Sequence, residues 1–299
     1  MQHEYPLQIV ERIARAKSIR AAAEAMSITP SALNRRLLSL EEELETPLFE
    51  RLSTGVRLNA AGEIFLTHAR RQLADMKAVR SKIADLKGAR QGRVVIAHEA
   101  NLPPESGLLK QIAAYLRRYP GVSFAVHPCQ LAGAELALAD YSADFALLVG
   151  PLLSAQMTRL CTATLRVSVV LQKDHPEAHR SEIRLHQITP YPWALPGSGP
   201  LREIIEGSAQ RQGLVPRIAL ECAAGTATAL VQESNGVTFE FTTADQEALG
   251  SAFARRPLST RDAPSASLHL VQLRGRTLSV AASRFAEQLT KTFAAFSEA

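Results

Sequence analysis

The pattern of hydrophobic and polar residues predicts a helical N-terminal region. Apolar residues recur every three or four positions in PLQIVERIARA, which is the spacing of an amphipathic helix. An Ala-rich helix from Ile19 to Met26 follows, with Ser18 as its N-cap. A third helix runs from Pro30 to Glu45 after the cap residue Thr29, and proline at a first helical position loses no hydrogen bond. The short connection between the second and third helices predicts a helix-turn-helix.

The start of the third helix carries polar side chains that suit DNA. Asn pairs with adenine, Arg pairs with guanine, and Ser or Thr pairs with either base in the major groove. These residue types stand on the exposed face of the helix, at Thr29, Ser31, Asn34 and Arg35. The pattern therefore favours a recognition helix, although a solvated helix of any helical bundle has the same composition.

A hairpin and a long helix are predicted next. Glu50 to Leu58 forms two short strands that turn at Ser53-Thr54-Gly55, the wing of a winged helix, with Arg51, Ser53 and Thr54 near phosphates. Asn59 caps a helix from Ala60 to about Lys87, which is about 40 Å long at 1.5 Å per residue. A single small domain does not need so long a helix. Its apolar stripe therefore predicts a seam between two subunits, formed by Leu66, Ala69, Leu73, Met76 and Ile83.

Several landmarks in this region occur in one order and without gaps. They are Ala22-Ala23, the Ser- and Thr-rich start of the third helix, Leu40-Glu41, Leu44, Leu48-Phe49, Arg51, Leu58 and Ala61-Gly62. On these positions the stretch SIRAAAEAMSITPSALNRRLLSLEEELETPLFERLSTGVRLNAAGEIFLTHA resembles the DNA-binding domain of the LysR-type transcriptional regulators. The resemblance implies DNA contacts at Ser18, Thr29, Pro30, Ser31, Asn34, Arg35, Arg36, Arg51, Ser53 and Thr54.

Four positions depart from the family pattern. Lys17 and Glu45 stand where the family usually has glycine, and Asn59 replaces the usual threonine cap. We expect these three to leave the fold intact. Asn34 stands where the family commonly has serine, which predicts an individual base preference.

The remaining two hundred or so residues predict an α/β fold. Strands at Arg93–Ala97, Val122–His127 and Phe145–Val149 alternate with helices at Leu108–Tyr119 and Ala132–Ala139. Strand–helix alternation of this kind indicates a parallel sheet. Further strands and helices follow, the next strand at Leu165–Leu171, and the chain closes with a long helix.

Landmarks of this region resemble the effector domain of the same family, which has the architecture of periplasmic solute-binding proteins. The matching stretches are YLRRYPGV, SADFALLVGP, NGVTFEF and LSVAASRFAEQL. The resemblance implies two subdomains that the chain crosses near Thr162–Leu165 and Ala263–Leu268, with a small molecule in the cleft between them. The expected domains are 1–58 (winged helix-turn-helix), 59–88 (linker and dimerisation helix) and 89–299 (effector-binding domain, with subdomain I at about 93–163 and 265–299 and subdomain II at about 164–264).

Candidate ligand contacts lie where strands end and helices begin. A carboxylate at Glu99 disfavours a carboxylate ligand unless it is neutral or paired with a cation, whereas the free N–H groups at a helix start suit an anion. The candidates are Glu99, Ala100, Asn101, Cys129, Gln130, Gly197, Ser198, Gly199, Gly225 and Thr226.

Composition adds a division of charge to this picture. Hydrophobic residues make up 46% of the chain, which excludes a disordered protein, and the net charge of +5 is small. Residues 1–90 hold 15 Lys and Arg against 11 Asp and Glu, whereas residues 91–299 hold 19 against 18. The positive excess therefore lies on the predicted DNA-binding part, which is a nucleic-acid signal, although a solvated helix face would also carry it.

Other chemistry is not predicted. The three cysteines form no CxxC pair, so a disulfide framework or structural zinc site does not fit, and a reducing cytoplasm is expected. The N-terminus lacks a signal-peptide layout, and no apolar run reaches the length of a membrane span. His175 and His179 stand beside Asp174, but Pro176 and the charged context favour a surface loop over a metal pair. We interpret Cys129 and Cys222 as small buried residues in preference to redox sensors.

The sequence thus predicts a LysR-type regulator without a metal or cofactor and without catalytic activity. Its expected partners are double-stranded promoter DNA, a small-molecule effector, further copies of the chain in a dimer or tetramer, and RNA polymerase, with no membrane. The main alternative is a ligand-binding α/β protein whose helical N-terminus mediates protein contacts only. An enzyme that uses the α/β cleft is a weaker alternative, because no nucleophile, base and orienting group meet in one motif.

Overall fold

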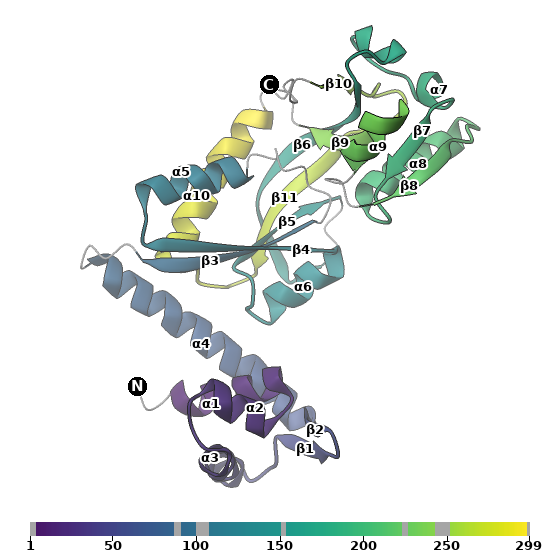
Figure 1. Ribbon diagram of the computed structural model, residues 1–299. Helices are drawn as coiled ribbons and strands as arrows, with labels where there is room; N and C mark the ends of the chain where they lie inside the picture. The colour runs from purple at the N-terminus through teal and green to yellow at the C-terminus, as the bar shows by residue number, and fades with distance from the viewer. Residues whose placement is uncertain are drawn as a thin grey trace. The chain divides into compact units, whose positions relative to one another are not determined.

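The chain folds as two compact units (Figure 1). One comprises Met1–Ala89 with Arg276–Val280, and the other Arg90–Gly275 with Ala281–Ala299. The computed structural model describes residues 4–86, 91–99, 108–150, 154–222, 227–242 and 252–297.

The N-terminal unit is a winged helix-turn-helix followed by a long helix. Its elements in chain order are α1 (Tyr5–Ala16), α2 (Ile19–Ala25), α3 (Pro30–Glu43), β1 (Phe49–Leu52), β2 (Gly55–Leu58) and α4 (Ala60–Leu86).

The predicted caps begin the two helices of the helix-turn-helix. Ser18 Oγ accepts a hydrogen bond from the N–H of Ala21 at 3.3 Å, and Thr29 Oγ1 accepts one from the N–H of Ala32 at 3.2 Å. These bonds satisfy N–H groups that a helix start leaves without a partner. The third helix ends two residues before its predicted end, because Glu45 adopts a left-handed conformation with φ 54°. Lys17 does the same at the end of α1, with φ 51°, which explains why glycine suits both positions.

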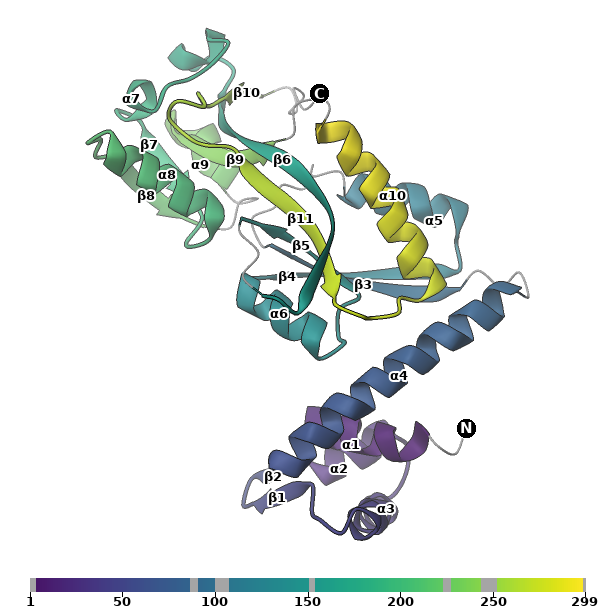
Figure 2. The same cartoon turned by 180° about the vertical axis from the view of Figure 1, so that it is seen from behind.

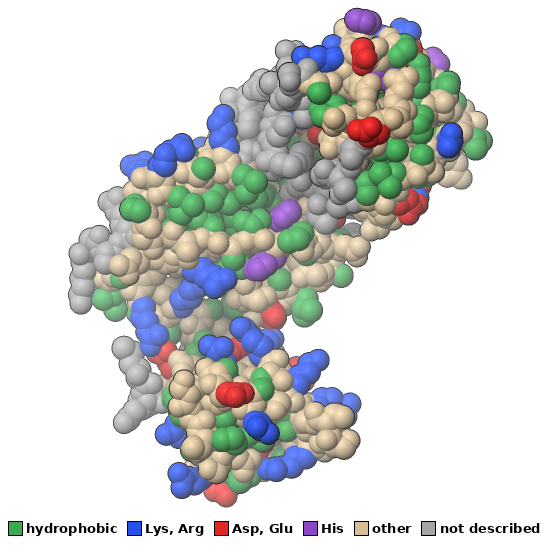
Figure 3. All heavy atoms as spheres, viewed as in Figure 1, with side chains coloured by type: hydrophobic (Ala, Val, Ile, Leu, Met, Phe, Trp, Pro, Cys, Tyr) green, Lys and Arg blue, Asp and Glu red, His purple; other side chains and the backbone are tan. Residues whose placement is uncertain are grey.

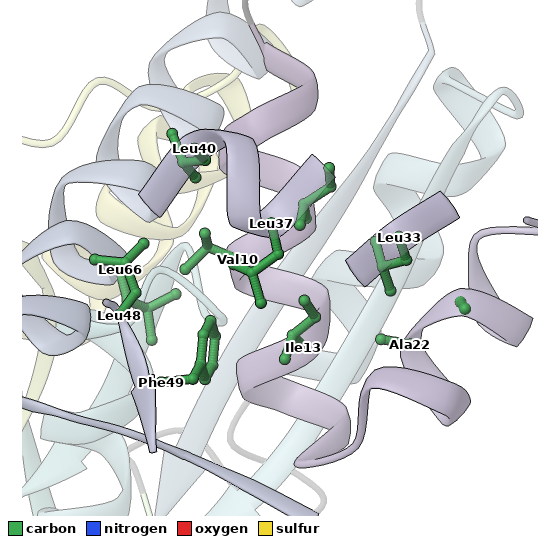
Figure 4. Packing of buried hydrophobic residues seen from close by; sticks show 11 residues of the cluster. Val10, Ile13, Ala22, Leu33, Leu37, Leu40, Leu48, Phe49 and Leu66 are labelled. Carbon is green, nitrogen blue, oxygen red and sulfur yellow. The ribbon is translucent and has the colours of Figure 1, made fainter. Parts of the chain in front are cut away.

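Apolar side chains from all three short helices form one core (Figure 4). Val10 and Ile13 of α1 are fully buried against Ala22 of α2 and Leu33 of α3. The small Ala22 side chain allows α2 to approach its neighbours closely. Burial of each leucine contributes about 1.5–3 kcal/mol to the stability of the unit. The apolar residues at helical spacing in the sequence are therefore the residues whose burial stabilises this unit.

The wing is a hairpin docked on the α1–α2 turn. β1 and β2 pair antiparallel, with Leu52 opposite Gly55, so that Ser53 and Thr54 form the loop. The N–H of Val56 donates to the carbonyl oxygen of Lys17 at 3.0 Å. Gly55 has φ +143°, and a Cβ there would lie 2.3 Å from that same oxygen, so the docked wing requires glycine at this position.

Asn59 caps the long helix α4 as the usual threonine would. Its Oδ1 accepts from the N–H of Gly62 at 2.8 Å, and its Nδ2 donates to the carbonyl oxygen of Pro47 at 2.8 Å. The amide thus satisfies the helix start and ties it to the preceding loop.

The apolar stripe of α4 divides into two parts. Leu66 and Ala69 are 4% and 0% exposed and pack inside the N-terminal unit. The prediction that these two residues form a seam between subunits is therefore wrong, because the helix-turn-helix already covers them. Farther along α4, Val79, Ile83 and Leu86 are exposed by 46%, 50% and 88%.

The second unit is an α/β fold built on one mixed sheet. Its elements in chain order are β3 (Gly92–Glu99), α5 (Leu108–Arg118), β4 (Val122–Cys129), α6 (Leu131–Ala139), β5 (Phe145–Val149), β6 (Met157–Gln172), a 3₁₀ helix (Pro176–His179), α7 (Leu185–Ile188), β7 (Pro192–Leu195), α8 (Pro200–Arg211), β8 (Arg217–Glu221), α9 (Ala227–Ser234), β9 (Val237–Thr242), β10 (Phe253–Pro257), β11 (Ala266–Leu273) and α10 (Val280–Ser297).

The long strand β6 joins the two halves of the sheet, namely β4-β3-β5-β11 on one side and β9-β7-β8 on the other. The strand order is β4-β3-β5-β11-β6-β9-β7-β8, with β10 also paired to β6. Residues Met157 to Leu165 of β6 pair with β11, and Arg166 to Gln172 pair with β9 or β10. Of this strand, the sequence predicted only Leu165–Leu171, and it did not predict β10 or α7.

The helices cover both faces of the first half of the sheet. α5 and α10 lie together on one face, and α6 lies on the other (Figures 1 and 2). The Tyr115 and Phe285 rings of α5 and α10 pack edge to face with centroids 5.3 Å apart, and the Tyr115 hydroxyl donates to the carbonyl oxygen of Ala281 at 3.1 Å. Aromatic pairs in this geometry add to the stability that burial provides.

His175 contradicts the predicted surface loop. The side chain is 1% exposed, its Nδ1 accepts from the N–H of Glu177 at 3.1 Å, and its ring lies 4.3 Å from the ring of Tyr191. The ring is buried by its tertiary contact with Tyr191, which the charged neighbours in the sequence do not indicate. No group of three or more potential metal ligands occurs within the part of the chain that the structure describes. Nor does any described helix combine the length and apolar character of a membrane span.

Candidate DNA interface and ligand cleft

The N-terminal half of α3 presents the predicted polar side chains. Thr29, Ser31 and Arg35 are exposed, and Asn34 is half-buried. The hydroxyls of Thr29 and Ser31 lie 3.2 Å apart, within hydrogen-bond distance. This cluster has the donors and acceptors that reach base edges and phosphates.

Two further predicted DNA residues, Arg36 and Ser18, also have contacts within the unit. The guanidinium of Arg36 lies 4.5 Å from the centre of the Tyr5 ring of α1, a cation–π geometry. The Ser18 hydroxyl accepts the cap hydrogen bond of α2. Pro30 is exposed at the first position of α3.

The wing brings one arginine to the recognition helix. Arg51 Nη2 donates to Asn34 Oδ1 at 3.1 Å. The second wing arginine, Arg57, forms an ion pair with Glu50 at 2.6 Å. Because Asn34 is neutral, Arg51 keeps its full positive charge, whereas Glu50 neutralises Arg57. The loop residues Ser53 and Thr54 are exposed beside them.

Glu41 has a structural role beside this candidate interface, although the sequence marked it only as a landmark. Its Oε1 accepts from the N–H of Leu48 at 2.7 Å and from the N–H of Phe49 at 3.3 Å. Charged acceptors of this kind are among the stronger hydrogen bonds. The carboxylate therefore fixes the start of β1 against α3, which no local pattern indicates.

Lys and Arg side chains surround the N-terminal unit on the face drawn in Figure 3. This distribution agrees with the excess of 15 Lys and Arg over 11 Asp and Glu in residues 1–90. A basic surface attracts the phosphate backbone of DNA irrespective of sequence.

Predicted ligand contacts from the two halves of the second unit meet. Gln130 Nε2 donates to Ser198 Oγ at 3.1 Å, although the two residues belong to different halves. Glu99 and Cys129 end neighbouring parallel strands and are partners in the β3–β4 register. The thiol of Cys129 donates to the carbonyl oxygen of His98 at 3.3 Å.

A cavity of about 350 Å³ opens beside these residues, a size that suits a small molecule. Two ionisable side chains line it, and the sequence singled out neither of them. Glu203 lies in the first turn of α8, after the Gly197-Ser198-Gly199 loop, and His269 lies on β11. The lining residues are Val149, Gly150, Pro200, Glu203, Ile204, Pro264, Ser265, Ala266, Ser267 and His269.

The cleft is negative rather than positive. Burial raises the pKa of Glu99, and the charge of Glu203 raises it further, against a backbone hydrogen bond from Val149. Burial lowers the pKa of His269, as does Arg159, which favours the neutral imidazole. Among the described lining residues there is no Lys or Arg.

Cys129 and Cys222 are half-buried, not fully buried as the sequence predicted. Burial raises the pKa of the Cys129 thiol, and the Glu99 charge raises it further. Burial also raises the pKa of Cys222. Reactive cysteines have lowered pKa values, so these two stay protonated at neutral pH.

Four predicted contacts lie outside the described residues, namely Ala100, Asn101, Gly225 and Thr226. Gly197 is exposed, and a Cβ there would meet no atom within 4 Å. Gly199, with φ +103°, forms the N-cap of α8 next to the cavity.

We expect Glu99→Gln to stabilise the free protein at neutral pH. The raised pKa means that ionised Glu99 destabilises the folded state above its folded pKa. This penalty fades as pH falls through that value toward the ordinary 4.5. The variant should therefore unfold at a higher temperature than the wild type near neutral pH, and the difference should shrink on acidification.

Thermal unfolding from about pH 8 to pH 5 measures this difference. Glu287→Gln, at an exposed position of α10, removes the same charge and serves as the control. A Glu99→Gln variant that is less stable than the wild type at neutral pH would contradict the expectation.

Comparison with known proteins finds two family models that match successive parts of this chain. Residues 6–63 match the model of the bacterial regulatory helix-turn-helix proteins of the lysR family, and residues 87–294 match the LysR substrate binding domain. The transcriptional regulator PunR of Escherichia coli (strain K12) is 32% identical over 147 residues, which are 49% of this chain and 47% of PunR. The matched part therefore spans about half the length of that relative.

Solved structures show the same fold. A full-length OxyR variant from Pseudomonas aeruginosa aligns with a TM-score of 0.69 and 17% identity over 97% of both chains. CbnR in complex with its target DNA aligns with a TM-score of 0.62 and 18% identity, over 97% of this chain and 99% of CbnR. With both family models matched in order along one chain, the protein belongs to the LysR family of bacterial helix-turn-helix regulatory proteins.

Proposed function

We propose that this protein is a transcriptional regulator that binds promoter DNA through α3 and the wing. The observation that carries the proposal is the exposed cluster of Thr29, Ser31 and Arg35, with Arg51 beside it on the wing. The N-terminus of α3 enters the major groove, and Arg51 with Ser53 contacts phosphates. The crystal structure of CbnR in complex with its target DNA supports DNA as the partner of this chain.

Binding to the promoter fragment upstream of the gene tests this proposal. Fluorescence anisotropy with the full-length protein should give a higher affinity for this fragment than for a scrambled fragment of the same length and composition. The measurements are made at one fixed salt concentration, because phosphate contacts make every such affinity depend on salt. Equal affinity for the two fragments would remove sequence-specific binding from the proposal.

A small molecule in the cleft regulates the protein under this proposal. The Gln130–Ser198 hydrogen bond links the two halves beside the cavity, so a ligand that competes for either side chain favours a different arrangement of the halves. The carboxylates of Glu99 and Glu203 disfavour a ligand whose only polar group is itself a carboxylate. We propose that the effector presents a cationic or hydrogen-donating group to these residues.

The exposed part of α4 supports a dimer or tetramer. Met76, Val79, Ile83 and Leu86 follow a 3-4-3 spacing, which is the pattern of a helix–helix seam. A two-fold dimer carries two recognition helices and therefore binds an inverted repeat. Promoter binding places the protein in the cytoplasm, where it alters transcription through RNA polymerase.

We expect Ile83→Asp to convert the protein to monomers. A carboxylate at the centre of the seam has no partner there, and its burial is costly. Sedimentation velocity measures the change at a concentration where the wild type is oligomeric. Lys82→Asp is the control, because it places a new carboxylate one residue away and off the apolar line, with an even larger change in net charge. If Ile83→Asp sediments as the wild type does, the seam lies elsewhere.

A further inference from the structure

The hydrogen bond between Arg51 and Asn34 connects the wing to the recognition helix. Arg51 Nη2 donates to Asn34 Oδ1 at 3.1 Å across 17 positions of sequence. Strand β1 holds Arg51 there because the Glu41 carboxylate accepts from the first residues of the strand. Asn34 and Glu41 are seven residues apart and share a face of α3, so β1 runs along this face and brings Arg51 to Asn34.

The chemistry of the pair determines how the Asn34 amide points. A guanidinium has donors only, whereas an amide has an acceptor oxygen and a donor nitrogen. The oxygen of Asn34 must therefore face Arg51, and an inverted amide would set two donors against each other. Its Nδ2 is consequently turned away from Arg51, available to donate to another group.

We propose that Arg51 is a specificity-determining residue, because it presents Asn34 to DNA as a hydrogen-bond donor. The inference rests on the proposed function, since it concerns the base that α3 contacts. Guanine, adenine and thymine each offer an acceptor in the major groove, whereas cytosine offers only a donor there. With its oxygen bonded to Arg51, Asn34 selects against cytosine as the base that it contacts directly.

This role differs from a phosphate contact alone. A phosphate contact positions the protein but carries no sequence information. Arg51 has five N–H donors, so one can hold Asn34 while others bind a phosphate. Arg57 lies on the same hairpin and is paired with Glu50, which makes it the matched control for loss of an arginine.

Selection from a randomised DNA library with the full-length protein tests the inference. Asn34→Ala first identifies the position whose base preference depends on Asn34. At that position the wild type should disfavour cytosine by about tenfold, since one good base contact is worth that much. Arg51→Met keeps the aliphatic stem and removes the donors, and it should reduce the discrimination to about twofold or less. Arg51→Lys keeps a donor and should retain it, and Arg57→Ala should leave it unchanged.

The outcomes are distinct. If Arg51→Met weakens binding to all sequences equally and cytosine stays disfavoured, Arg51 is a phosphate contact only and the inference is overturned. If Asn34→Ala changes no position while the wild type still selects a sequence, Asn34 contacts no base and the inference is also overturned. A wild type that selects no sequence at all instead contradicts the proposed function. In the double variant of Asn34→Ala and Arg51→Met, the preference at this position should equal that of Asn34→Ala alone.

Discussion

Gly62→Ala is expected to destabilise the N-terminal unit by about 3 kcal/mol, since overpacking a closed contact costs this much. A Cβ at Gly62 would lie 2.1 Å from the carbonyl oxygen of Leu48 and 2.7 Å from Cδ2 of Leu58. The Leu48 oxygen cannot retreat freely, because it already accepts from the N–H of Asn59 at 3.1 Å. The start of α4 would have to move away from the loop that holds the wing.

Denaturant unfolding measures the loss, and hydrogen-exchange mass spectrometry locates it in α1 to α4. Gly207→Ala is the matched control within helix α8, where the new Cβ meets only the mobile end of Arg211 at 3.4 Å. Alanine is the better helix former, so this variant should gain about 0.5–1 kcal/mol. A Gly62→Ala protein as stable as the wild type would show that the contact relaxes without cost.

Arg35→Ala should lower the affinity for the promoter fragment by about tenfold to a hundredfold, because a base-reading arginine is worth about 1–3 kcal/mol. Arg35 is exposed on α3, six residues after the N-cap Thr29. Its loss should weaken binding to the promoter much more than binding to scrambled DNA.

Arg36→Ala is the matched control, because it removes the same charge from the next position. The Arg36 guanidinium lies over the Tyr5 ring and so faces α1. We expect a smaller loss that is similar for both DNA fragments. Titration by fluorescence anisotropy separates the two variants. If Arg35→Ala weakens binding to both DNA fragments alike, Arg35 contacts phosphate and contacts no base.

The helices of the N-terminal unit could be predicted almost residue by residue. Their signals are local, namely a cap residue, a proline at the first position and apolar residues on one face. The predicted end of α3 was two residues too long, because Glu45 turns left-handed without the glycine that usually marks such a turn. The seam on α4 was partly wrong for a different reason. Leu66 and Ile83 belong to the same predicted stripe, and only packing against α1 to α3 distinguishes the buried residue from the exposed one.

In the second unit, local patterns predicted some strands and missed others. Strand Phe145–Val149 has five buried apolar residues and was predicted with its exact bounds. Residues Met157–Thr164 of β6 lack a regular alternation of polar and apolar side chains, which is the local signal of a strand. Their strand depends on pairing with β11 more than a hundred residues later. His175 was assigned to a surface loop from its charged neighbours, yet tertiary contacts with Tyr191 bury it.

The amino-acid sequence by itself determined the family, the order of the elements, the cap residues and the placement of the positive charge. These depend on residue types at short spacings, which remain the same whatever the chain does elsewhere. The tertiary structure alone decided which polar groups meet, such as Arg51 with Asn34 and Gln130 with Ser198. A hydrogen bond needs donor and acceptor within about 3 Å, and residues 17 or 68 positions apart reach that distance only when the chain between them is folded.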